Sequence, residues 1–80
     1  MTADIHPAPE VRRAQVLSLA MDYATSNSIE AVEPEARRIG VNLCDPLSMA
    51  ALSVLADCLR FGVEPSPRAL LHLGVSEQVA

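Results

Sequence analysis

Two cysteines and two histidines are the residues of this 80-residue chain best suited to metal binding or nucleophilic chemistry. Cys44 and Cys58 are fourteen residues apart, and along a helix this spacing corresponds to roughly 20 Å. A disulfide requires Cα atoms within about 7 Å, so we expect both thiols to stay reduced and to act as small apolar side chains. A metal site would need them to converge with His6 or His72, and no C-x-x-C or H-x-x-x-H spacing supports this.

Catalytic carboxylate pairs need a pocket that gives the two groups different environments. The carboxylates of this chain are instead spread over expected loops and polar faces: Asp4, Asp22, Glu30, Glu33, Glu35 and Glu64. A nucleophilic cysteine with His72 as its base would need a cleft that excludes water, and 80 residues leave little room for one. The pattern therefore predicts a protein that is not an enzyme.

The charge balance argues against a nucleic-acid partner, because the chain has six Lys and Arg against ten Asp and Glu, a formal charge of −4. Residues 36–42 (ARRIGVN) do place Ala four residues before Gly, as in the turn of a helix-turn-helix motif. The helix that would then read bases, residues 47–61, is apolar and has Arg60 only near its far end. The remaining arginines near these motifs are expected to be solvated or to contact an acidic partner: Arg12, Arg13, Arg37 and Arg38.

The first helix that positions these charged and reactive side chains is predicted over residues 9–26. Pro9 suits the first helical position, Glu10 complements the positive helix end, and Asn27 can adopt the left-handed conformation that ends a helix. We expect one apolar stripe to be buried, with a wider apolar margin beside it and Gln15 on the polar face. The stripe consists of Val11, Ala14, Leu17, Met21 and Ala24, and the margin of Val16, Leu19, Ala20 and Tyr23.

A second helix is predicted between Asp45 as N-cap, Pro46 as first residue and Gly62 as the stop. It is apolar around most of its circumference, because three of its polar residues fall within ~60° of one another at 100° per residue. These three are Ser53, Asp57 and Arg60. The helix must therefore be central in the fold or carry an additional apolar face for a partner.

The other segments predict shorter elements. Ser66 caps a third helix that Gly74 ends, and a last turn is expected over residues 76–80. Residues 28–32 and 34–39 predict two separate turns, the second opened by Pro34. Nothing alternates with period two, so the fold class is all-α, a small bundle of three to four helices.

At the level of domains, we expect residues 1–8 to form a flexible N-terminal arm and residues 9–80 a single helical domain. The first residues have neither the basic segment nor the apolar run of a signal peptide. No apolar stretch approaches the ~20 residues of a membrane span. We therefore expect no membrane partner and a cytoplasmic location.

Three runs resemble the last third of an acyl or peptidyl carrier protein: residues 60–64 (RFGVE), 67–71 (PRALL) and 75–80 (VSEQVA). In that family a helix ends in a phrase like F-G-V-E, a short loop and a phrase like R-A-L-F follow, and the closing helix often finishes L-A. Size, acidity and the absence of Trp are also similar. The resemblance covers residues 43–80, with helix placement alone before them, and implies a carrier-protein-like bundle.

The family carries 4′-phosphopantetheine on a serine at the start of its second helix, within a phrase such as G-x-D-S-L, and the thiol of that arm holds acyl groups. Residues 44–49 of this chain read CDPLSM. If Asp45 and Leu47 match the D and L, Pro46 replaces the serine and the chain cannot be modified. If residues 48–51 (SMAA) match the S-L-x-A that follows, Ser48 is the attachment residue. The alternative for Ser48 is a polar residue of the first helical turn, present because serine is tolerated at helix starts.

Two functional hypotheses follow. The first is a small stand-alone carrier-like protein that presents acyl or aminoacyl groups on a phosphopantetheine arm at Ser48 to enzymes of a biosynthetic pathway. The second is a non-catalytic helical interaction module, as a homodimer, adaptor or inhibitor, whose apolar second helix is buried against a partner; a carrier-like fold that has lost its serine is one form of this hypothesis. Asp57 is the one acidic residue of a helix that is usually acidic in the family, so we expect a more apolar docking surface there. Its candidate residues are Met49, Leu52, Leu55 and Asp57, and the alternative for the three apolar ones is the core, where residues at helical spacing lie more often than in an interface.

Overall fold

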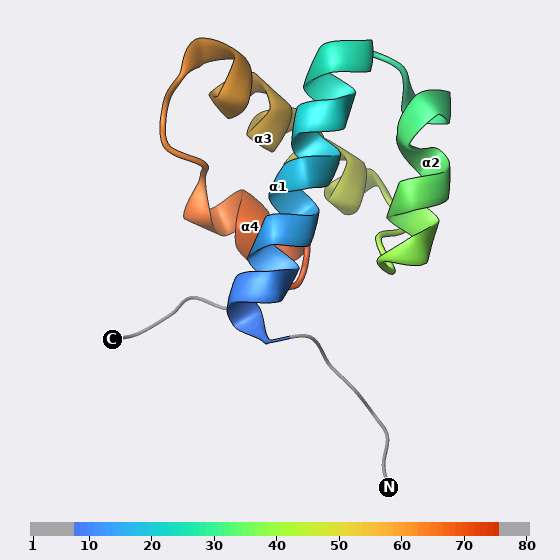
Figure 1. Ribbon diagram of the computed structural model, residues 1–80, viewed down its shortest axis with the longest axis horizontal. Coiled ribbons are helices and arrows are strands. Elements are labelled where there is room, and N and C mark those ends of the chain that lie inside the picture. Colours follow the sequence, from blue (N-terminus) through green and yellow to red (C-terminus); the bar gives the residue numbers. More distant parts are fainter. Residues whose placement is uncertain (1–7, 76–80) are drawn as a thin grey trace, which may run out of the picture.

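Four helices make up the computed structural model, which describes residues 8–75. They are α1 (Pro9–Ser26), α2 (Ile29–Arg38), α3 (Pro46–Phe61) and α4 (Pro67–His72), as Figure 1 shows. Residues 8–75 contain no strand, so the predicted all-α class with a small helical bundle is confirmed. The last turn predicted for residues 76–80, and all but Ala8 of the predicted N-terminal arm, lie outside the described residues.

Local capping chemistry sets most of the helix ends. The side chains of Ser28, Asp45 and Ser66 each accept a hydrogen bond from the backbone N–H three residues later, which satisfies a donor that the first helical turn leaves free. Asn27 ends α1 with φ 56° and Gly62 ends α3 with φ 69°, both in the left-handed region. The predicted bounds of the two long helices are therefore confirmed.

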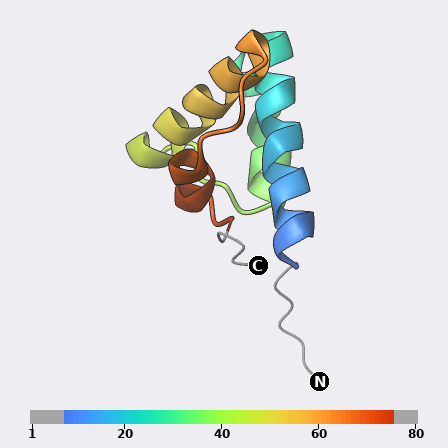
Figure 2. The ribbon, with the colours of Figure 1, turned by 90° about the vertical axis from the view of Figure 1, so that its left-hand side faces the viewer.

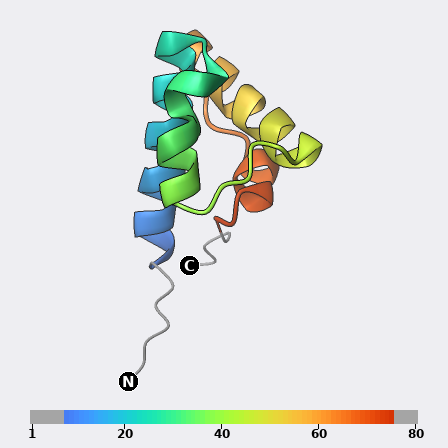
Figure 3. The same ribbon diagram turned by 90° about the vertical axis from the view of Figure 1, so that its right-hand side faces the viewer.

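The two long helices form a V that the shorter helices fill. Figure 2 shows α1 and α3 converging at their C-terminal ends and diverging at their N-terminal ends, with α4 between the separated halves. α2 runs back along α1 in the opposite direction (Figure 3). The packed pairs are α1 with α2, α1 with α3, and α3 with α4.

The core is aliphatic, as expected for a chain with one Phe, one Tyr and no Trp. The largest side chains with under 2% exposure come from three of the helices: Val16 and Leu19 of α1, Val32 of α2, Leu52 and Leu55 of α3. No polar or charged residue among the described ones is buried. Burial of these aliphatic side chains contributes about 25 cal/mol for each Å² removed from water, and this burial holds the four helices together.

The prediction of which face of α1 is buried is wrong. Val11 and Met21, on the predicted stripe, are 47% and 49% exposed, whereas Val16, Leu19 and Ala20 of the margin are fully buried. α1 packs against both α2 and α3. The side of α1 that faces these two helices is centred on Val16. At 100° per residue, Met21 lies on nearly the opposite side of α1 from Val16.

The two turns predicted on either side of Pro34 are instead one helix, α2. Pro34 lacks the N–H that would bond to the carbonyl of Glu30, and such a proline costs a helix about 3 kcal/mol in its interior. Val32 and Ala36, four residues apart, are both buried against the core. Their shared burial holds the segment in one helical register despite the proline.

Candidate functional site: the outer face of α3

Ser48, the predicted attachment residue, lies in the first turn of α3 and is half-buried. Its backbone N–H donates to Asp45 Oδ2 over 3.2 Å, and its Oγ donates to the same oxygen over 3.0 Å. Asp45 is the N-cap of α3, so the hydroxyl of Ser48 is part of a helix start. A modifying enzyme would have to turn this hydroxyl away from the carboxylate before it could be used as a nucleophile.

The predicted docking residues divide between the two sides of α3. Leu52 and Leu55 are fully buried in the core, so their prediction as an exposed docking surface is wrong. They face α1 and the rest of the core because α3 is central in the V. Met49 is half-buried and packs against the same core, while Asp57 lies on the exposed side.

The exposed side of α3 carries large apolar residues at intervals of seven. Leu47 is 62% exposed, Val54 44% and Phe61 76%, and Ala50 and Asp57 are exposed residues between them on the same side of the helix. Seven residues are nearly two helical turns, so all five lie along one stripe with the spacing of a coiled-coil seam. We call this stripe the outer face of α3.

Sequence reasoning missed the outer face, although a signal for it is present. Residues 46–61 are apolar around nearly the whole helix, which predicts either a helix in the centre of the fold or a helix with an additional apolar face. In the structure α3 is central and also has an exposed apolar side. The residues selected for docking, Leu52 and Leu55, lie on the side with the strongest core packing. A search for apolar residues at intervals of seven would have found Leu47, Val54 and Phe61.

A groove between α3 and α4 borders the outer face. It has a volume of about 190 Å³ and is open to solvent. Its lining is mainly apolar, and its ionisable side chains are Arg68 and His72 of α4; the other lining residues are Leu47, Ala50, Ala51, Val54, Ser66 and Ala69. A chain with net charge −4 thus places basic side chains at the edge of its exposed apolar stripe.

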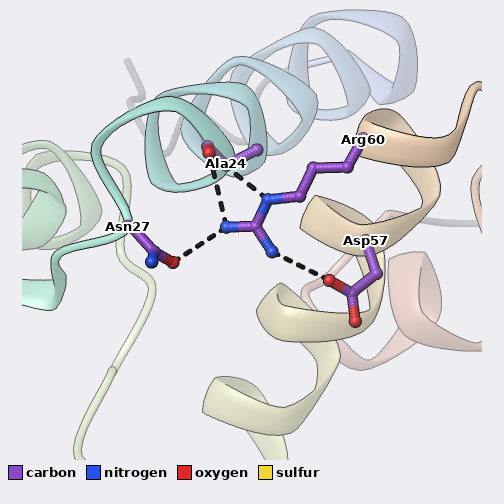
Figure 4. A network of polar contacts seen from close by, with 4 residues as sticks. All are labelled: Ala24, Asn27, Asp57 and Arg60. Atoms are coloured by element: carbon purple, nitrogen blue, oxygen red, sulfur yellow. Dashed lines mark hydrogen bonds and ion pairs between the residues drawn. The ribbon is translucent and has the colours of Figure 1, made fainter.

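Arg60 fixes the orientation of α3 relative to α1 (Figure 4). Its Nε and Nη2 donate to the carbonyl oxygen of Ala24 over 3.4 and 3.3 Å, and Nη2 also donates to Asn27 Oδ1 over 2.9 Å. Its Nη1 pairs with Asp57 Oδ1 over 2.9 Å. The C-terminal end of α1 is thereby tied to the last turns of α3, at the apex of the V.

Arg12 ties α1 to the ends of two other helices. Its Nε and Nη2 donate to the carbonyl oxygen of Leu73 over 3.2 and 3.0 Å, and its Nη1 donates to the carbonyl oxygen of Ile39. Both carbonyls belong to C-cap residues, those of α4 and α2, where arginine satisfies acceptors left free by the helix end. We interpret Arg12 as a structural residue, because its guanidinium is occupied by these backbone contacts.

Comparison of the chain with protein-family models, with curated proteins and with solved structures gives no match.

Other kinds of site find little support in the described residues. No group of three or more His, Cys, Asp or Glu comes together among residues 8–75 in an arrangement that could hold a metal ion. Cys44 and Cys58 are both free, as predicted, but Cys44 is exposed and does not serve as a core residue. A second open groove, at the end of α2, includes Glu33 and Arg37, which form an ion pair with each other over 2.9 Å. None of the described helices combines the length and apolarity that crossing a bilayer requires.

Proposed function

We propose that this chain is a non-catalytic helical interaction module that binds another protein chain through the outer face of α3. One observation carries the proposal: Leu47, Val54 and Phe61 are exposed at intervals of seven on a helix whose opposite side is fully buried. Several large apolar side chains exposed along one side of a helix are costly in water, and such a surface typically marks an interaction site. A stripe with this spacing fits the side of another helix.

The side chains at the edge of the outer face of α3 indicate what kind of partner would bind there. Arg68 and His72 lie where the edge of a bound helix would pass, beside the apolar groove between α3 and α4. Complementary charge at such a border favours the correct partner and the correct register. The partner is therefore an amphipathic helix with apolar residues along one side and carboxylates at its edge.

Photo-crosslinking in the cells that produce the chain tests this proposal. A photoreactive benzophenone amino acid is placed at Val54, and in a control chain at Met21, an α1 residue of similar exposure, 49% against 44%. We expect a discrete protein adduct at position 54 and none at position 21. Equal yields at the two positions, or no discrete adduct at position 54, would contradict the proposal.

A carrier-like protein is the second candidate, favoured by the position of Ser48. This residue lies in the first turn of α3 beside the exposed Leu47, and the resemblance to acyl and peptidyl carrier proteins implies attachment of 4′-phosphopantetheine at this place. In this candidate the partners are biosynthetic enzymes, which dock on the neighbouring outer face. The two free cysteines agree with a reducing compartment, so for both candidates we propose a cytoplasmic location.

Incubation with coenzyme A and a promiscuous phosphopantetheinyl transferase tests the second candidate. If it is correct, the intact mass increases by one phosphopantetheine, and Ser48→Ala abolishes the increase. An unchanged mass for the unsubstituted chain rejects the carrier candidate. The explanation would then be that Pro46 replaces the serine that carries the arm in the family.

A further inference from the structure

We infer that protonation of His72 strengthens binding at the outer face of α3, so that the chain binds its partner more tightly at about pH 6 than at about pH 8. The inference rests on the proposed function and adds the regulation of the same site. It follows from the position of His72 and Arg68 beside the groove between α3 and α4, and from the charges around them.

His72 and Arg68 lie on one side of α4 and face the outer face of α3. They are four residues apart, a spacing that places two side chains one above the other on a helix. Both are exposed, and both line the groove together with Leu47 and Val54 of the outer face. A helix that covers Leu47 and Val54 therefore brings its edge to these two basic side chains.

The groups around His72 are neutral or positively charged within residues 8–75. The α3 side of the groove is uncharged and consists of Leu47, Ala50, Ala51 and Val54. On α4 the charged neighbour is Arg68, and from α1 Arg12 reaches the end of α4, where it donates to the carbonyl oxygen of Leu73. None of the ion pairs among these residues includes Arg68 or His72. We therefore expect the negative charge at this edge to come from the partner.

Protonation of His72 doubles the positive charge at this edge. Histidine is the side chain whose charge ordinarily changes between about pH 5 and pH 8, and His72 is the one histidine among residues 8–75. The partner's carboxylates stay ionised in this range, because Asp and Glu ordinarily titrate at about pH 4. The attraction between the edge and the partner therefore increases as the pH falls, and the bound carboxylates in turn favour the protonated imidazole.

Photo-crosslinking at two pH values tests the inference. p-Benzoylphenylalanine replaces Phe61, which is 76% exposed on the outer face and does not line the groove. The purified chain is mixed with serial dilutions of a lysate from the cells that produce it, and the dilution that gives half of the maximal adduct is measured. We expect half-maximal adduct to need about two- to fivefold less lysate at pH 6 than at pH 8, the effect of one exposed ion pair. Weaker binding at pH 6, as expected for a partner whose phosphate takes up a proton at about that pH, would overturn the inference.

Two histidine variants assign the pH dependence. His72→Gln removes the titrating group and retains a good helix former, so we expect the difference between the two pH values to disappear with helical content retained. His6→Gln removes the other histidine of the chain and should keep the difference. A difference that persists in His72→Gln, or one that is lost in His6→Gln, would overturn the inference.

A matched pair of arginine variants tests whether the edge meets a negative charge. Arg68→Gln removes the permanent charge beside His72, so we expect half-maximal adduct to need about two- to fivefold more lysate at pH 8. Arg13→Gln makes the same change on α1, where Arg13 is exposed, and should have little effect. Equal effects of the two variants would overturn the inference, because the partner would then carry no carboxylate at this edge.

The same adducts separate failure of this inference from failure of the proposed function. A discrete adduct at position 61 that needs the same amount of lysate at both pH values overturns the regulation by His72 and leaves the proposed function standing. If no discrete adduct forms at either pH, the proposed function fails and the inference fails with it.

Discussion

The inner and outer sides of α3 are both apolar, yet their surroundings are opposite. Leu52 and Leu55 are fully buried by α1 and the rest of the core, whereas Leu47 and Phe61 are more than half exposed. The inner residues decide whether the chain folds, because their burial contributes most of the core at this helix. The outer residues keep much of their apolar surface in water when the chain is alone, and this exposure is explained if another chain covers them.

Substitution on the inner side has the largest expected effect. Leu52→Ala removes a fully buried side chain and should lower the free energy of unfolding by about 2–5 kcal/mol, through lost burial and the cavity left behind. Urea denaturation measures this loss. Val54→Ala, two residues further along, is the matched control and should change the same quantity by no more than about 0.5 kcal/mol. Similar losses for both variants would remove the distinction between the two sides.

The end of α3 allows stability to be changed without altering either side. Gly62 has φ 69°, and a Cβ added there would meet no atom within 4 Å. The cost of Gly62→Ala therefore comes from the backbone alone, about 1 kcal/mol in the free energy of unfolding. We expect this loss in urea denaturation. An unchanged free energy of unfolding would contradict a left-handed backbone conformation at this helix end.

Ser48 lies at the boundary between the two sides and should contribute little to either. Ser48→Ala loses the bond from Oγ to Asp45 but keeps the capping bond from the backbone N–H, and alanine is the better helix former. The free energy of unfolding should therefore change by no more than about 0.5 kcal/mol. A larger loss in thermal denaturation would show that the hydroxyl is a structural part of the cap.

The smallest change in the free energy of unfolding is expected at the ion pair between Glu35 and Arg38 of α2, which lies on the surface away from α3. Hydrogen bonding to Arg38, with a smaller coulombic contribution, lowers the pKa of Glu35 in the folded chain from its ordinary value of 4.5. A carboxyl whose pKa is lower in the folded than in the unfolded chain stabilises the fold above its unfolded pKa, and the effect is lost as the pH falls through the folded pKa. Glu35→Gln should therefore be slightly less stable than the unsubstituted chain above pH 4.5 and equally stable well below it. A difference that persists in acid, measured by thermal denaturation across pH, would contradict this assignment.

The ends of the helices could be predicted from sequence because their causes are local. Asp45, Ser66 and Gly62 act through their own side chain or backbone conformation on the neighbouring turn, and no distant residue alters that chemistry. The continuity of α2 through Pro34 could not be predicted in this way, because burial of Val32 against the core outweighs the local signal.

The buried faces of the long helices could not be chosen from sequence for a related reason. α1 has apolar residues around both Val16 and Met21, and α3 around both Leu52 and Val54. Periodicity reports that a face is apolar, but only packing decides which of two apolar faces becomes the core. The outer face of α3 is the consequence, and its interval of seven was present in the sequence.

Photo-crosslinking from Leu47 on α3 and from Val11 on α1, in the cells that produce the chain, tests the central claim most directly. The claim is that the outer face of α3 is the surface through which the chain binds another protein chain. Leu47 is 62% exposed and Val11 47%, and we expect a discrete protein adduct from position 47 and none from position 11. No discrete adduct from position 47, or equal yields from the two positions, would contradict the claim.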